Sequence, residues 1–282
     1  MNFVLLIKCP DRSGLIAAVS SWIHEHGGNI VDADQHTDAA TALFFMRVNF
    51  NVGAGGASFS ELRTSLNTLS SRFDMQVELH DTSIETRVAV FVGKTPHCLY
   101  DLLLNQRMGE LPGKIALVIS NHTDLADVAG HFDVPFHHVP VTAANKAGAE
   151  QRQRELLESA AIDLVVLARY MQVLSAEFSA DYAGRAINIH HSFLPAFAGA
   201  KPYQQAFERG VKLIGATGHY VTSELDEGPI IAQDTRRVTH RDTGEDMARK
   251  GQDLERRVLT QAVRLHLERR VLLAGNKTIV FG

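Results

Sequence analysis

The sequence has few of the residues that build disulfide frameworks or structural zinc sites. Its 282 residues include two cysteines, Cys9 and Cys98, which lie far apart and form no Cys-x-x-Cys pair. This spacing excludes a disulfide-stapled secreted scaffold and argues against a zinc ribbon. Such sparse cysteine use favours a reducing compartment, so we expect a cytoplasmic protein.

Long apolar runs and an excess of one charge are also missing. The run from Phe3 to Ile7 is followed almost at once by Pro10, and it is too short for a signal peptide or a membrane span. The 28 basic and 32 acidic side chains are interspersed and give a net charge of −4. We therefore expect neither a nucleic-acid nor a membrane partner.

Residues 1–84 predict a small α/β domain. Apolar strand-like runs cover 3–7, 29–36, 41–50 and 75–79, and amphipathic helices cover about 15–23 and 59–69. Asp11 or Ser13 is the expected N-cap of the first helix. The order β-α-β-β-α-β is the ferredoxin-like pattern. Polar residues near 80–86 form a short linker.

Two short motifs in this segment resemble those of ACT domains, which are small regulatory modules that often bind amino acids. They are Cys9-Pro10-Asp11-Arg12-Ser13-Gly14-Leu15-Ile16 and Gly27-Gly28-Asn29-Ile30. Amides at the start of the first helix could hold a carboxylate. The resemblance therefore implies an effector site at Asp11, Ser13, Gly14 and Asn29. The alternative is that Gly14 only permits a tight loop.

Residues 85–282 alternate between apolar strands and helices. Strands are expected at 87–92, 115–119, 136–139, 164–167, 186–190, 213–221 and 229–233, with helices at 97–107, 125–132, 145–161, 176–182, 202–208 and about 243–269. Such alternation predicts a doubly wound, mostly parallel, Rossmann-like sheet. Ligands bind such sheets beyond the carboxyl ends of the strands.

One of these strand ends carries residues suited to acyl-group chemistry. In Ala186–Pro195, Asn188 and His190 share one face of the strand because side chains alternate between faces. An amide can hydrogen-bond a developing oxyanion, and an imidazole can transfer a proton. Further on, Asp226 opens the segment Asp226-Glu227-Gly228, which either contributes a functional carboxylate or only makes a hairpin turn.

Three segments taken in order resemble the signature of folate-dependent formyltransferases. They are Asn188-Ile189-His190-His191-Ser192-Phe193-Leu194-Pro195, His219-Tyr220-Val221 and Asp226-Glu227-Gly228-Pro229-Ile230-Ile231. Together with the ACT-like module, the chain is similar to the formyltetrahydrofolate deformylase family. The resemblance implies hydrolysis of 10-formyltetrahydrofolate to formate and tetrahydrofolate, with no cofactor beyond the folate substrate. It assigns catalysis to Asn188, His190 and Asp226, support to His219, and substrate contacts to Leu167, Arg169, Tyr170, Met171, Leu174 and Leu225.

Two other functions stay open. The scaffold could transfer the formyl group to an amine, as in glycinamide ribonucleotide transformylases, or the chain could be a catalytically silent, amino-acid-responsive regulator. The transformylases have a glycine-rich phosphate loop after the first strand of this domain. Here Val92 to Leu99 contains one glycine, and Pro96 lacks an amide donor. Such a loop is a poor phosphate cradle, which favours water as the acceptor.

Fourteen histidines raise the question of a metal site. His190 and His191 are adjacent on a strand, so we expect their side chains to point to opposite faces, and the same holds for His137 and His138. With incomplete ligand sets, we expect no metal. Cys98 is either an activated thiol or a buried helix residue. An exposed sheet edge in the ACT-like domain favours a homo-oligomer.

Overall fold

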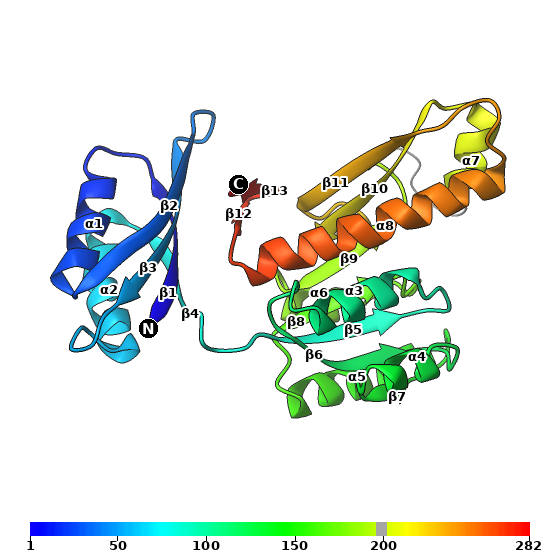
Figure 1. Ribbon diagram of the computed structural model, residues 1–282, viewed down its shortest axis with the longest axis horizontal. Helices are drawn as coiled ribbons and strands as arrows, with labels where there is room; N and C mark the ends of the chain where they lie inside the picture. Colours follow the sequence, from blue (N-terminus) through cyan, green and yellow to red (C-terminus); the bar gives the residue numbers. More distant parts are fainter. Residues whose placement is uncertain (196–201) are drawn as a thin grey trace. The chain divides into compact units, whose positions relative to one another are not determined.

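The computed structural model describes residues 1–195 and 202–282, and the chain divides into two compact units. The first contains Met1–Glu85 with Arg269–Ala274 and Ile279–Gly282. The second contains Thr86–Glu268 with Gly275–Thr278. Each unit has its own β-sheet, as Figure 1 shows.

The first unit is built on a four-stranded antiparallel sheet in the order β2-β3-β1-β4. Its elements are β1 (Asn2–Pro10), α1 (Leu15–Glu25), β2 (Gly28–Asp38), β3 (Leu43–Val52), α2 (Phe59–Phe73) and β4 (Gln76–Asp81). This confirms the β-α-β-β-α-β prediction. One face of the sheet packs against both helices through Phe3, Leu5, Trp22, Phe50 and Leu62. The expected N-cap is wrong, because Gly14 occupies that position of α1 and no side chain caps the helix.

The opposite face of the same sheet is covered by residues from far downstream. These residues form the hairpin of β12 (Val271–Ala274) and β13 (Lys277–Val280), which the sequence pattern did not predict. Leu272 and Phe281 pack on Val4, Leu6 and Phe45. A division into 1–84 and 85–282 therefore needs correction, because part of the segment after Glu268 belongs to the first unit.

The second unit is built on a seven-stranded sheet in the order β11-β10-β9-β8-β5-β6-β7. The strands are β5 (Arg87–Val92), β6 (Lys114–Ser120), β7 (Phe136–His138), β8 (Leu164–Ala168), β9 (Ala186–His190), β10 (Leu213–Tyr220) and β11 (Ile230–Arg237). Strands β5 to β9 are parallel, whereas β10 runs antiparallel to both of its neighbours. The mostly parallel sheet is thus confirmed.

Helices cover both faces of this sheet. They are α3 (His97–Arg107), α4 (Ala126–His131), α5 (Lys146–Ser159), α6 (Ala176–Asp181), α7 (Pro202–Arg209) and α8 (Gly244–Leu267). Phe91 on β5 packs among residues of α5 and α6. On the other face, α8 lies along β9, β10 and β11 and contacts α3. Since β6 and β8 flank β5 on opposite sides, the strand order reverses at β5, where doubly wound sheets place their ligand crevice.

Within residues 1–195 and 202–282, none of the helices combines the length and the apolar character that a bilayer span requires.

Candidate active site

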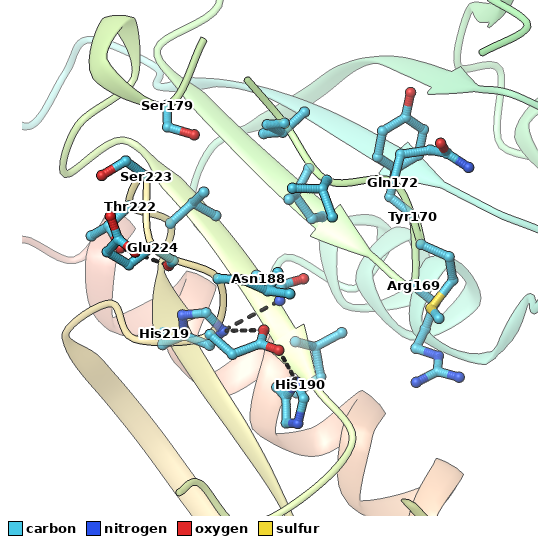
Figure 2. Close-up of a pocket in the computed structure, with 18 of the residues that line it drawn as sticks. Arg169, Tyr170, Gln172, Ser179, Asn188, His190, His219, Thr222, Ser223 and Glu224 are labelled. Carbon is cyan, nitrogen blue, oxygen red and sulfur yellow. Dashed lines mark hydrogen bonds and ion pairs between the residues drawn. The ribbon is translucent and has the colours of Figure 1, made fainter. Parts of the chain in front are cut away.

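A cavity of about 280 Å³ opens at the carboxyl ends of β8 and β9. Figure 2 shows Asn188 and His190 on one strand, with His219 facing them and Arg169 and Tyr170 across the pocket. All the residues predicted from the formyltransferase resemblance line it, namely Leu167, Arg169, Tyr170, Met171, Leu174, Asn188, His190, His219, Leu225 and Asp226.

Asn188 is oriented by the strand next to it. In the antiparallel pairing of β9 and β10, Asn188 lies directly opposite His219, and its amide nitrogen is 3.2 Å from His219 Nε2. His219 Nδ1 lies 2.9 Å from the carbonyl oxygen of Tyr220. The His219 ring is therefore held at both nitrogens, with Nδ1 donating to this carbonyl and Nε2 facing the Asn188 amide and Asp226. The Asn188 amide carries two N–H groups, so one can make this contact while the other serves a ligand.

His190 and Asp226 form the second contact of the site. His190 Nδ1 lies 3.1 Å from Asp226 Oδ2, and His219 Nε2 lies 3.7 Å from Asp226 Oδ1. Hydrogen bonding to His190, and then to His219, holds the pKa of Asp226 well below its usual range. Asp226 is therefore ionised at neutral pH. His190 is buried, and among the described residues its Nε2 has no hydrogen-bond partner.

The turn that presents Asp226 is pressed against β10. Asp226 has a left-handed backbone with φ 57°, which aspartate tolerates better than most residues. A Cβ at Gly228 would lie 1.7 Å from the carbonyl oxygen of Tyr220, so this close approach requires glycine. Asp226-Glu227-Gly228 is thus a tight turn, and it also delivers a carboxylate to the imidazoles of His190 and His219.

The predicted substrate residues divide into a buried wall and an exposed rim. Leu167 and Tyr170 are buried. The Tyr170 hydroxyl accepts a hydrogen bond from Gln153, and burial raises its pKa to about 12. Met171 and Leu225, both 66% exposed, stand at the rim. The pocket therefore combines an apolar rim with a polar centre, which suits a partly aromatic ligand.

His191 does not lie where strand alternation predicts. Its ring stacks on His190 with centroids 5.0 Å apart and planes inclined by 12°. The expectation of opposite faces is wrong because β9 ends at His190, so alternation no longer applies to the next residue. His191 Nδ1 accepts a hydrogen bond from Arg169. Burial and the Arg169 charge lower the pKa of His191 to about 4, so it is neutral at physiological pH.

A buried carboxylate behind the pocket was missed at the sequence level. Glu255 on α8 is 1% exposed and contacts His97, Arg169 and Tyr203. The sequence could have indicated this burial, because Glu255 falls within the apolar stripe of an amphipathic helix.

Cys98 lies beside this carboxylate. Donor atoms of His97, Cys98 and Glu255 lie within 4.8 Å of one another, as in some metal sites. However, both Glu255 oxygens already accept hydrogen bonds, from His97 and from Tyr203. Burial raises the pKa of the Cys98 thiol well above its ordinary value, so the thiol is protonated. This favours the buried helix residue over the activated thiol.

The predicted effector residues are only partly brought together. Asp11, Ser13 and Gly14 line a cavity of about 570 Å³ in the first unit, with Gln35 to Thr37 on its other side. Asn29 is not part of it. Asn29 lies near the start of β2, whereas the cavity lies near the end of that long strand, roughly 20 Å further along.

Comparison with known proteins places these features in two families. The formyl transferase family matches residues 86–263, and the ACT domain family matches residues 3–54. A formyltetrahydrofolate deformylase from Synechocystis is 48% identical over 100% of this chain and 99% of its own length. One from Bacillus subtilis is 47% identical over 98% of this chain and 93% of its own.

Solved structures give the same picture. A formyltetrahydrofolate deformylase from Pseudomonas syringae pv. tomato superposes with a TM-score of 0.97 at 46% identity, covering 100% of this chain and 94% of that one. A glycinamide ribonucleotide transformylase from Symbiobacterium toebii gives a TM-score of 0.67 at 32% identity, covering 72% of this chain and 97% of that one. The chain belongs to the formyltetrahydrofolate deformylase family.

Proposed function

We propose that the chain hydrolyses 10-formyltetrahydrofolate to formate and tetrahydrofolate in this pocket, with Asn188, His190 and Asp226 as the catalytic residues. The observation that carries the proposal is their convergence. The His190–Asp226 contact of 3.1 Å and the Asn188–His219 contact of 3.2 Å bring three polar groups from two segments to one end of the sheet.

Asn188 is assigned to the oxyanion. As water adds to the formyl carbon, the formyl oxygen gains negative charge, and the free N–H of the Asn188 amide donates to it. The contact with His219 fixes the amide before the substrate binds. A preorganised donor of this kind stabilises the transition state more than the ground state.

His190 and Asp226 are assigned to proton transfer. The ionised Asp226 stabilises a protonated imidazole at Nδ1 of His190, and the unpartnered Nε2 is free to exchange a proton with the reacting groups. In the balanced reaction, a bond forms between the water oxygen and the formyl carbon, and the bond from that carbon to the folate nitrogen breaks. The nitrogen takes up a proton, and formate leaves.

The pterin is placed against the strand-end residues Leu167 to Leu174 and against Leu225. Large apolar side chains at the rim support this placement, since Met171 and Leu225 would otherwise remain largely in water. His219 acts as a positioning residue for Asn188 and Asp226.

One assay tests the function. The purified chain is incubated with 10-formyltetrahydrofolate alone, and formate is followed. Release without an acceptor is expected. Turnover only with an added amine would instead support the formyltransferase alternative, which the likeness to glycinamide ribonucleotide transformylase keeps in view. Absence of turnover under both conditions would support a silent regulator.

We further propose that the cavity at Asp11, Ser13 and Gly14 binds an amino-acid effector, with the α-carboxylate at the first amides of α1. Thermal shift of the intact protein against a panel of amino acids tests this, with Ser13→Trp, which puts a large side chain at the cavity, expected to abolish the shift. A shift that survives this substitution would place the effector elsewhere.

We also propose a cytoplasmic homo-oligomer. Both cysteines are free and buried, as suits a reducing compartment. β2 and β4 are the edge strands of the first sheet, and edges are ready surfaces for pairing. Light scattering coupled to size exclusion measures the mass in solution, and a monomer at micromolar concentration would contradict the proposed assembly.

A further inference from the structure

The crevice where the strand order reverses is occupied by the chain's own side chains. Doubly wound sheets bind ligands between the carboxyl ends of the strands that flank this point. Here those strands are β5 and β8. Arg169 follows β8, and His97 begins the helix after β5. They meet Glu255 from α8 and Tyr203 from α7.

These four side chains converge on a single carboxylate. Glu255 Oε2 lies 2.8 Å from His97 Nε2 and 3.5 Å from Arg169 Nε, and the Tyr203 hydroxyl donates to Oε1. Burial alone would raise the pKa of Glu255, but His97, Arg169 and Tyr203 together lower it, so the group stays ionised. Within the cluster, the Glu255 carboxylate and the Arg169 guanidinium compensate each other's charge.

Packing around the cluster is close. Gly251 lies one turn before Glu255 on α8, and a Cβ there would fall 2.1 Å from the Tyr203 ring. A Cβ at Gly93 would fall 2.6 Å from the carbonyl oxygen of Arg169, so the loops after β5 and β8 are in direct contact. The cluster also reaches the proposed catalytic residues, because Arg169 contacts His191, and His191 stacks on His190.

We propose that Arg169, Glu255, His97 and Tyr203 form an internal plug. The plug fills the crevice at the carboxyl ends of β5 and β8, beside the proposed catalytic residues, where an amine acceptor would have to lie. It thereby makes water, rather than a primary amine, the acceptor of the formyl group. The proposal rests on the proposed site. Water and an amine attack the same carbon, forming a C–O or a C–N bond, while the folate nitrogen leaves with a proton. Water can reach that carbon beside His190, whereas an amine substituent needs the volume that the plug occupies.

The test combines Arg169→Gly with Glu255→Ala. Residue 169 has φ 63°, which glycine adopts freely, and the double change removes both charges so that neither is left buried alone. The matched control is Arg236→Ala with Asp253→Ala, an exposed pair at 3.1 Å whose carboxylate lies on the same helix. Each protein receives 10-formyltetrahydrofolate and a concentration series of glycinamide, and formate and N-formylglycinamide are quantified by mass spectrometry.

The readout is the ratio of N-formylglycinamide to formate. Both products come from the same bound donor, so the ratio is insensitive to weaker folate binding. Wild type and control should give a ratio at the detection limit, and opening the plug should raise the ratio about 10-fold or more above that limit. An unchanged ratio in a folded double variant overturns the plug, as does equal transfer by the wild type. If wild type releases no formate at all, the hydrolysis proposal fails instead.

A second variant guards against loss of the fold. Tyr203→Ala opens the crevice from α7 while Glu255 keeps His97 and Arg169 as partners. It should raise the same ratio, and Tyr203→Phe, which retains the ring, should raise it less. Equal ratios in Tyr203→Ala and wild type would contradict the plug even if the double variant did not fold.

Discussion

Asn188 and His219 face each other across β9 and β10, with the amide nitrogen of one 3.2 Å from the ring nitrogen of the other. The amide is therefore held in one orientation by the sheet itself. In the proposed mechanism, a donor fixed in this way needs no reorganisation when negative charge develops on the formyl oxygen.

Asn188→Ala should lower kcat on the order of 10²- to 10³-fold, because it removes a single preorganised donor. The melting temperature should change little. Formate release and thermal melts measure the two effects, with the exposed Asn29→Ala as the control that leaves both unchanged. Retained turnover together with a large loss of thermal stability would show that Asn188 is structural.

Asp226→Asn should remove a pH-dependent contribution of the Asp226 carboxylate to the free energy of unfolding. Hydrogen bonding to His190 lowers the pKa of Asp226 in the folded state, so the unfolded chain binds the proton more readily. The stabilisation is fully present above the ordinary aspartate pKa of about 4 and is lost as the pH falls below it. Asparagine tolerates the same backbone region.

Urea unfolding of wild type and Asp226→Asn across this range gives the measurement. The difference in unfolding free energy should be constant above about pH 5 and should shrink progressively below about pH 4. A difference that grows as the pH falls would reverse the sign of the proposed coupling.

Glu255→Gln should destabilise the second unit by about 3–5 kcal/mol, because it leaves the Arg169 guanidinium with no carboxylate partner in a buried site. Asp253→Asn on the same helix breaks exposed pairs and should cost under about 1 kcal/mol. Denaturant midpoints give the stability of the two variants.

Arg169→Gly combined with Glu255→Ala should lower the free energy of unfolding by less than the sum of the two single changes. Strict additivity would argue against coupling between the two residues.

Gly228→Ala should reduce both stability and turnover. The added methyl would overlap the carbonyl oxygen of Tyr220, so the turn that carries Asp226 has to move away from His190. Crowding of this kind typically costs about 1–3 kcal/mol. Gly130→Ala, where the added atom meets nothing within 4 Å, is the matched control. Wild-type kcat/KM in Gly228→Ala would show that the Asp226 position tolerates displacement.

Much of the fold followed from apolar periodicity. The alternation of strands and helices in residues 86–267 predicted the parallel sheet. The carboxyl ends of its strands then indicated where the pocket lies, at Leu167 and Asn188. Such inference works because a parallel sheet brings its carboxyl ends to one edge.

Contacts that depend on tertiary packing could not be predicted. The hairpin after Arg270 is two four-residue strands, whose pairing with each other and packing on Phe45 reflect no local pattern. The ring of His191 turns beside His190 because Arg169 holds it, and the partner lies 22 positions earlier. Residues distant in sequence decide these positions, so single-segment patterns carry no information about them.

The downstream cover on the first sheet has a consequence for biosynthesis. The ribosome translates Val4, Leu6 and Phe45 long before it reaches Leu272 and Phe281, which bury them. One apolar face of the nascent N-terminal unit therefore stays exposed to water until the second unit has been synthesised. Surfaces of this kind recruit chaperones or aggregate. A fragment ending at residue 85 would keep that face exposed to water permanently, so the first unit is best expressed with its C-terminal segment attached.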